Sequence, residues 1–107
     1  MRQVMGENTD QSEKNALVRA FRRQIERALK EERWRFADYF CDKILAEDPR
    51  DLEAWLLKGH LANHRFKDSR TAISCYRQVL VLGAYDSSDT LVAQAREALD
   101  GLLERYS

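Results

Sequence analysis

Two histidines lie four residues apart in "HLANH", a spacing that places both side chains on one face of a helix. His60 and His64 are the only histidines of the chain, and a pair at this spacing can share a metal ion. However, no acidic or thiol residue is spaced to complete the ligand set. The pair is therefore predicted to face solvent or a bound peptide, and no metal or other cofactor is expected.

The two cysteines, Cys41 and Cys75, are the second candidate for chemistry. A catalytic thiol needs a nearby base, and no motif places a histidine beside either of them. Both are expected to be free and buried, as in proteins of a reducing compartment such as the cytoplasm. The chain also has no phosphate-binding glycine loop, paired carboxylates or serine-nucleophile motif, so no enzymatic activity is expected.

A basic run, "RAFRRQIERALKEERWR", extends from Arg19 to Arg35 and holds seven basic and three acidic residues. One interpretation is a solvated helix surface with ion pairs such as Arg22–Glu26. The other is an electropositive lip for an acidic peptide or a nucleic-acid backbone. The end of the chain is acidic instead, and a basic head with an acidic tail could stack molecules head to tail.

Net charge and hydropathy argue against two classes of partner. The 18 basic and 18 acidic residues balance, whereas a dedicated nucleic-acid binder usually carries a clear basic excess. No stretch approaches the roughly 20 apolar residues of a membrane span. Neither nucleic acid nor a membrane is therefore expected as a partner.

Apolar residues recur every three or four positions, which is the spacing of amphipathic helices. The pattern predicts five helices: 14–31, one from about 36 to Asp48 before Pro49, 51–64, 69–82 and 88–105. Gly83 is the predicted C-terminal cap of the fourth helix. Residues 1–13 are predicted to be a mobile tail, and residues 14–107 a single helical domain.

The first two helix pairs repeat each other. A shift of 34 residues places Phe21 on Trp55 and Ile25 on Gly59, and a shift of 35 places Cys41 on Tyr76. This is the length of a tetratricopeptide repeat, and residues 18–105 resemble that family, with repeats at 18–51 and 52–86 and a capping helix at 88–105. The resemblance implies that Gly59 lies where two helices cross closely and that Ala72 faces it.

The resemblance implies an all-α fold of antiparallel helical hairpins stacked as a short superhelix. In this family the first helix of each repeat lines a concave groove. The corresponding positions are Arg19, Arg22, Glu26, Leu29 and Lys30 in the first repeat, and Glu53, Leu56, His60, Asn63 and His64 in the second.

The function expected from this arrangement is non-catalytic binding of a peptide or protein segment, including one with acidic residues. Leu56 is expected to offer an apolar patch between arginines at one edge and hydrogen-bonding side chains at the other. The alternative is a module for homo-oligomerisation or for assembly of a larger complex.

Overall fold

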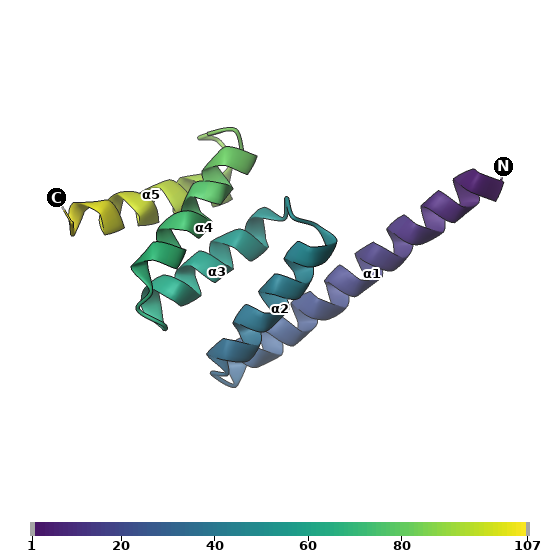
Figure 1. The fold of residues 1–107 in the computed structure, drawn as a ribbon, viewed down its shortest axis with the longest axis horizontal. Coiled ribbons are helices and arrows are strands. Elements are labelled where there is room, and N and C mark those ends of the chain that lie inside the picture. The colour runs from purple at the N-terminus through teal and green to yellow at the C-terminus, as the bar shows by residue number, and fades with distance from the viewer. Residues whose placement is uncertain (1, 107) are drawn as a thin grey trace. The chain divides into compact units, whose positions relative to one another are not determined.

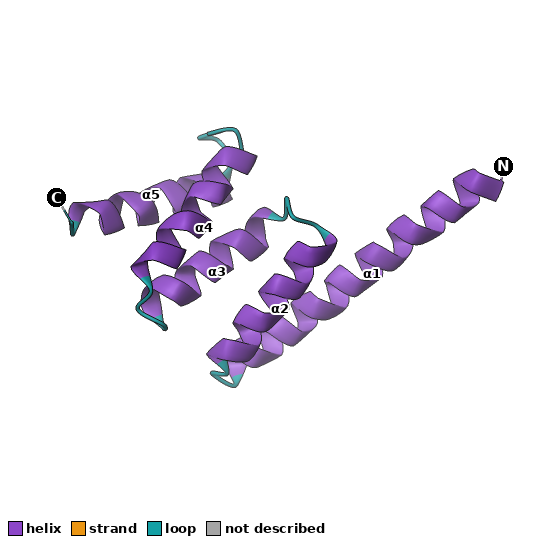
Figure 2. Cartoon of the chain, in the orientation of Figure 1, coloured by secondary structure: helices purple, strands orange, loops and turns teal. Residues whose placement is uncertain are grey.

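The computed structural model describes the backbone of residues 2–106 and the side chains of residues 10–106. Over these residues the chain forms five helices joined by loops, with no strand, as Figure 2 shows. Their bounds are α1 (Arg2–Lys30), α2 (Trp34–Glu47), α3 (Leu52–His64), α4 (Ser69–Leu82) and α5 (Thr90–Glu104). The predicted all-α class is confirmed.

The helices fall into two compact units, residues 1–49 and residues 50–107, which are described separately. In the first unit α1 and α2 form an antiparallel hairpin. In the second, α3 and α4 form another, and α5 packs on α4 and touches α3 (Figure 1). The division lies beside the predicted repeat boundary between residues 51 and 52.

Helix α1 begins earlier than predicted, at Arg2 instead of Lys14. No proline interrupts this segment, and the Gln11 side-chain amide donates a hydrogen bond of 3.2 Å to Asn15 Oδ1 across one turn, a pairing that supports helical structure. Residues 10–17 are exposed. The predicted mobile tail falls largely on residues 1–9, whose side chains lie outside the described part.

The core of the first unit lies between α1 and α2. It is built from the small and branched side chains of Ile25, Ala28, Ala37, Cys41 and Ile44. The Phe21 and Phe40 rings, with centroids 6.0 Å apart, pack beside it. Two members of the predicted apolar faces, Leu17 and Phe36, are exposed instead.

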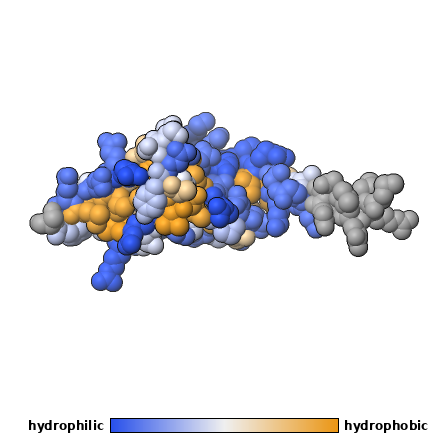
Figure 3. Space-filling view, turned by 90° about the horizontal axis from the view of Figure 1, so that it is seen from above, coloured by the Kyte–Doolittle hydropathy of each residue, from blue (hydrophilic) through white to orange (hydrophobic). Residues whose placement is uncertain are grey.

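The core of the second unit surrounds Tyr76, the largest fully buried side chain of the described residues. Side chains from α3, α4 and α5 pack together around it, and Trp55 packs against them while only half-buried. Figure 3 shows hydrophobic atoms of one face gathered over this unit, with hydrophilic side chains around them. Over the described residues, no helix combines the length and the apolar character that crossing a membrane requires.

Gly59 is buried inside α3 because a neighbouring helix leaves no room for a side chain. A Cβ atom there would lie 2.7 Å from Tyr76 Cε1 and 3.3 Å from Cys75 Cβ. The predicted close approach is therefore present. The predicted neighbour is wrong, because Tyr76, one turn further along α4 than Ala72, fills the space.

Gly83 caps α4 as predicted, but for a different reason. Its φ of −82° is an ordinary right-handed value, and the left-handed positions are the next two residues, Ala84 and Tyr85. A Cβ at Gly83 would collide with the Val92 side chain of α5. Gly83 thus allows α5 to pack close to the end of α4.

The described glycines of α3 and α5 provide a matched pair of substitutions. Gly59→Ala should lower the free energy of unfolding by about 1–3 kcal/mol, because its Cβ overpacks against Tyr76. Gly101→Ala should raise it by up to about 1 kcal/mol, because alanine favours helix and a Cβ there meets nothing within 4 Å. Urea unfolding followed by circular dichroism measures both. An equal gain in the two variants would contradict the close approach at Gly59.

Cys41 and Cys75 form no disulfide and are buried, as predicted. Burial shields a thiol from reagents. Both should therefore react with a thiol reagent at least about tenfold more slowly in the native protein than in urea. Mass spectrometry of the labelled protein counts the modified thiols, and rapid native labelling would place a cysteine at the surface.

Candidate functional site

A groove between α3 and α5 of the second unit is the candidate site. Its volume is about 390 Å³. We call it the α3/α5 groove. It is lined by His60, Asn63 and His64 of α3, by Gln94, Glu97, Ala98, Gly101 and Leu102 of α5, and by Arg105 directly after α5.

The α3 wall consists of three of the residues expected from the sequence. His60, Asn63 and His64 follow one another at spacings of three and four residues, so they rise from one face of the helix. The start of α3 is held by Asp51, whose carboxylate accepts a hydrogen bond of 2.9 Å from the Ala54 amide, a favourable N-cap. Other positions of α3, Ala54 and Leu61 among them, are buried.

His60 is bonded to the core beneath the groove. Its Nδ1 atom lies 2.7 Å from the hydroxyl oxygen of Tyr76, and the Asn63 side chain also hydrogen-bonds to that hydroxyl. The Asn63 bond lowers the pKa of Tyr76, while burial, the larger effect, raises it. The donor in the bond between Tyr76 and His60 is set by the tautomer of the imidazole.

Burial and the neighbouring His64 both disfavour a charge on His60. Burial is the larger cause of its lowered pKa, and repulsion from His64 adds to it. The two imidazole centroids are 5.9 Å apart. At neutral pH His60 is therefore an uncharged hydrogen-bonding group. Glu97 and Arg105 add one carboxylate and one guanidinium to the lining of the groove.

The α5 wall was not identified from the sequence. Gln94, Glu97, Gly101 and Arg105 follow one another at spacings of three, four and four residues, which is one helix face. This spacing was a usable signal. The prediction that residues 88–105 form a capping helix left this face without a binding role.

The predicted site residues of the first unit lie on α1, outside the α3/α5 groove. Arg19, Glu26 and Lys30 are exposed, and Arg22 and Leu29 are half-buried. Because the two units are described separately, a single surface that joins these residues to α3 stays a prediction.

Two predicted residues of α3 do not line the groove. Glu53 is exposed in the first turn of the helix, at its amino end. Leu56 is only 5% exposed and belongs to the core cluster of the second unit. The expected apolar patch at Leu56 is therefore wrong, because this side chain packs inward.

The side chains that line the groove can form hydrogen bonds and ion pairs. They supply amides, imidazoles, one carboxylate and one guanidinium. No group of three or more His, Cys, Asp or Glu side chains in the described part of the chain is placed to hold a metal ion. Comparison with protein-family models, with curated proteins and with solved structures finds no match to this chain.

The lowered pKa of His60 predicts a stability that falls on mild acidification. The unfolded chain protonates His60 near the ordinary value of about 6.5, while the folded state resists protonation, so the unfolded state binds more protons in this range. The free energy of unfolding should fall between pH 7.5 and 5.5. It should fall less in His60→Gln.

Histidine titration by NMR tests the two causes of the lowered His60 pKa, which are burial and the neighbouring His64. His64→Ala should raise the pKa of His60 toward the ordinary value, because it removes the neighbouring charge. An unchanged His60 pKa in His64→Ala, together with equal acid sensitivity of His60→Gln and wild type, would contradict this assignment.

Proposed function

We propose that the chain is a non-catalytic protein-interaction module that binds a peptide segment in the α3/α5 groove. The observation that carries the proposal is a groove lined by hydrogen-bonding side chains with an unexplained glycine, Gly101, in its wall. The resemblance of the chain to tetratricopeptide repeats supports the proposal, because the first helices of those repeats line a peptide-binding groove.

Gly101 weakens α5 without serving its packing. A glycine inside a helix costs about 1 kcal/mol relative to alanine. Unlike Gly59 and Gly83, Gly101 has no atom within 4 Å of the position that a Cβ would take. Its missing side chain leaves open space at the groove wall, where a ligand backbone can approach closely.

The lining indicates the kind of ligand. Side-chain amides such as those of Asn63 and Gln94 donate and accept hydrogen bonds, which matches the alternating N–H and C=O groups of an extended peptide. Glu97 on α5 and Arg105 directly after it are about two helical turns apart and carry opposite charges. They therefore favour one orientation of a charged ligand along the helix. A peptide segment with a basic and an acidic side chain fits this pattern.

Self-association is the alternative function. Exposed apolar side chains of the second unit, namely Val81, Tyr85 and Leu103, favour it, because each would gain free energy if a second copy covered it. Light scattering at several protein concentrations separates the two functions. A stable dimer supports self-association, and a monomer supports a module that binds another protein.

Site-specific photo-crosslinking tests the groove. A photoreactive amino acid in place of His64, which is exposed in the groove, should capture a partner protein from cell extract. The same amino acid in place of Arg77, which is exposed on α4 and does not line the groove, should not. Mass spectrometry identifies the captured protein and the crosslinked segment.

Gly101→Leu should then weaken binding of that segment at least about tenfold, or about 1.4 kcal/mol, because its side chain fills the groove. Its melting temperature should not fall, because the position has free space. Equal capture from both positions would overturn the proposal, and so would unchanged affinity of Gly101→Leu. Capture of a second copy of the chain would support self-association instead.

A further inference from the structure

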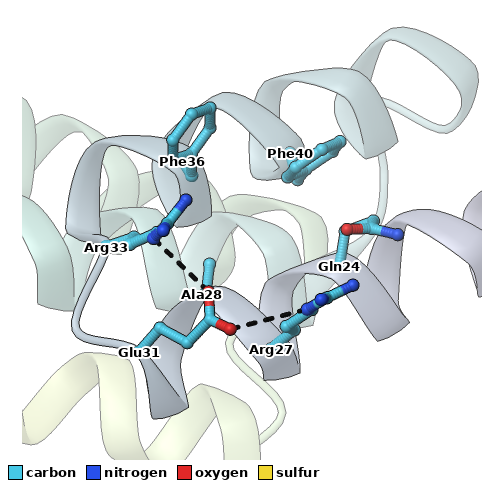
Figure 4. A pocket seen from close by; sticks show the side chains of 7 residues that line it. All are labelled: Gln24, Arg27, Ala28, Glu31, Arg33, Phe36 and Phe40. Carbon is cyan, nitrogen blue, oxygen red and sulfur yellow. Dashed lines mark ion pairs between the residues drawn. The ribbon is translucent and has the colours of Figure 1, made fainter.

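A second pocket lies in the first unit, beside the turn between α1 and α2. Its volume is about 320 Å³. Figure 4 shows phenylalanine side chains of α2 on one side of it and polar side chains of α1 on the other. We call it the α1/α2 pocket. It is lined by Gln24, Arg27, Ala28, Glu31, Arg33, Phe36 and Phe40.

One half of the α1/α2 pocket is apolar. Ala28 is buried, and Phe40 is half-buried beside it. Phe36 is 54% exposed, although a phenylalanine gains free energy when its ring leaves water. A small buried residue between two aromatic side chains, one of them exposed, makes room for an apolar side chain from a ligand.

The other half carries two arginines and one glutamate. Arg27 Nε and Arg33 Nε lie 3.5 and 3.4 Å from the two carboxylate oxygens of Glu31. The side chains of Arg27, Arg33 and Glu31 are 73%, 62% and 45% exposed, and such exposed ion pairs are weak. Each guanidinium has five N–H donors, and these contacts use one of each. The pair therefore retains donors and a net positive charge for a second carboxylate.

Arg33 also occupies a position where its positive charge disfavours the start of α2. It is the N-cap of α2 and makes no side-chain capping bond, and no acidic residue follows in the first turn. The helices of the second unit begin instead at Asp51, Asp68 and Asp89, each of which accepts a backbone hydrogen bond. Acidic or small polar residues are favoured at an N-cap, and a positive charge is disfavoured near a helix N-terminus.

This local conflict coincides with a pocket. The Arg33 guanidinium carbon lies 5.8 Å from the centroid of the Phe36 ring, so the disfavoured charge stands at the rim of the apolar half. Residues that break a local rule without a packing reason tend to mark functional sites. Five of the seven lining residues belong to the basic run from Arg19 to Arg35, and the pocket is consistent with the interpretation of that run as an electropositive lip.

We propose that the α1/α2 pocket binds a segment of a partner protein in which an apolar side chain is followed by a carboxylate. The apolar side chain packs over Ala28 between Phe36 and Phe40. The carboxylate accepts hydrogen bonds from Arg27 and Arg33, whose combined charge exceeds that of Glu31 by one. This site is separate from the α3/α5 groove and does not depend on the function proposed for it.

A pair of blocked tetrapeptides tests the proposal. One contains glycine, phenylalanine, glutamate and glycine in that order, with an acetylated amino end and an amidated carboxyl end. The other has glutamine in place of glutamate. In an NMR titration of the full chain, both should shift the resonances of Ala28 and Phe40. The acidic peptide should bind about three- to fivefold more tightly at low salt, and salt should reduce this difference.

Variants separate the two halves of the pocket. Arg33→Ser should reduce the affinity of the acidic peptide toward that of the neutral one. It should also raise the melting temperature, because serine is a favourable N-cap, so lost binding cannot be ascribed to misfolding. Phe36→Ala should weaken both peptides alike. Tyr85→Ala is the control, because Tyr85 is an exposed aromatic residue of the second unit that does not line the pocket.

Three results would each overturn the proposal. The first is equal affinity of the two peptides at low salt. The second is a set of shifts confined to residues of the α3/α5 groove. The third is a shift of the Ala28 and Phe40 resonances with protein concentration alone, which would identify a second copy of the chain as the occupant.

Discussion

The contact between Tyr76 and Gly59 determines most of the second unit. The tyrosine ring occupies the space that a side chain at residue 59 would fill, which sets how closely α3 and α4 approach. The same residue extends its hydroxyl to the α3/α5 groove, where it bonds to His60. Core packing and the orientation of the groove side chains therefore depend on one residue. A change at this contact must alter both.

The two units differ in how well local and tertiary preferences agree. In the second unit, aspartate caps begin three helices and the buried side chains form one cluster. In the first unit, the N-cap of α2 is Arg33, whose side chain makes no capping hydrogen bond. Phe36, the third residue of that helix, is exposed. Agreement between local preferences, such as helix capping, and tertiary packing is typical of sequences selected for folding. The conflict between capping preference and sequence at the start of α2 is therefore best explained by a requirement other than stability.

Periodicity was sufficient to predict the helices because each has an apolar face at helical spacing. The start of α1 was not predictable in this way, since residues 6–13 carry no apolar residue at helical spacing. The close approach at Gly59 was implied by the resemblance to tetratricopeptide repeats, but the neighbour implied with it was not the nearest one, because the register of α4 against α3 depends on the turn between them. Leu56 illustrates the same limit: its position on the helix was known, and its burial depended on α4 and α5.

The three glycines of the second unit are indistinguishable in the sequence, because they differ in the space around each one. Gly59 and Gly83 are required by close neighbours, Tyr76 in one case and Val92 in the other. Gly101 has no such neighbour and lies in the groove wall. The contact at Gly83 brings α5 against α4, and α5 then supplies the second wall of the groove. Two glycines thus position the helices, and the third leaves space between them that a ligand can enter.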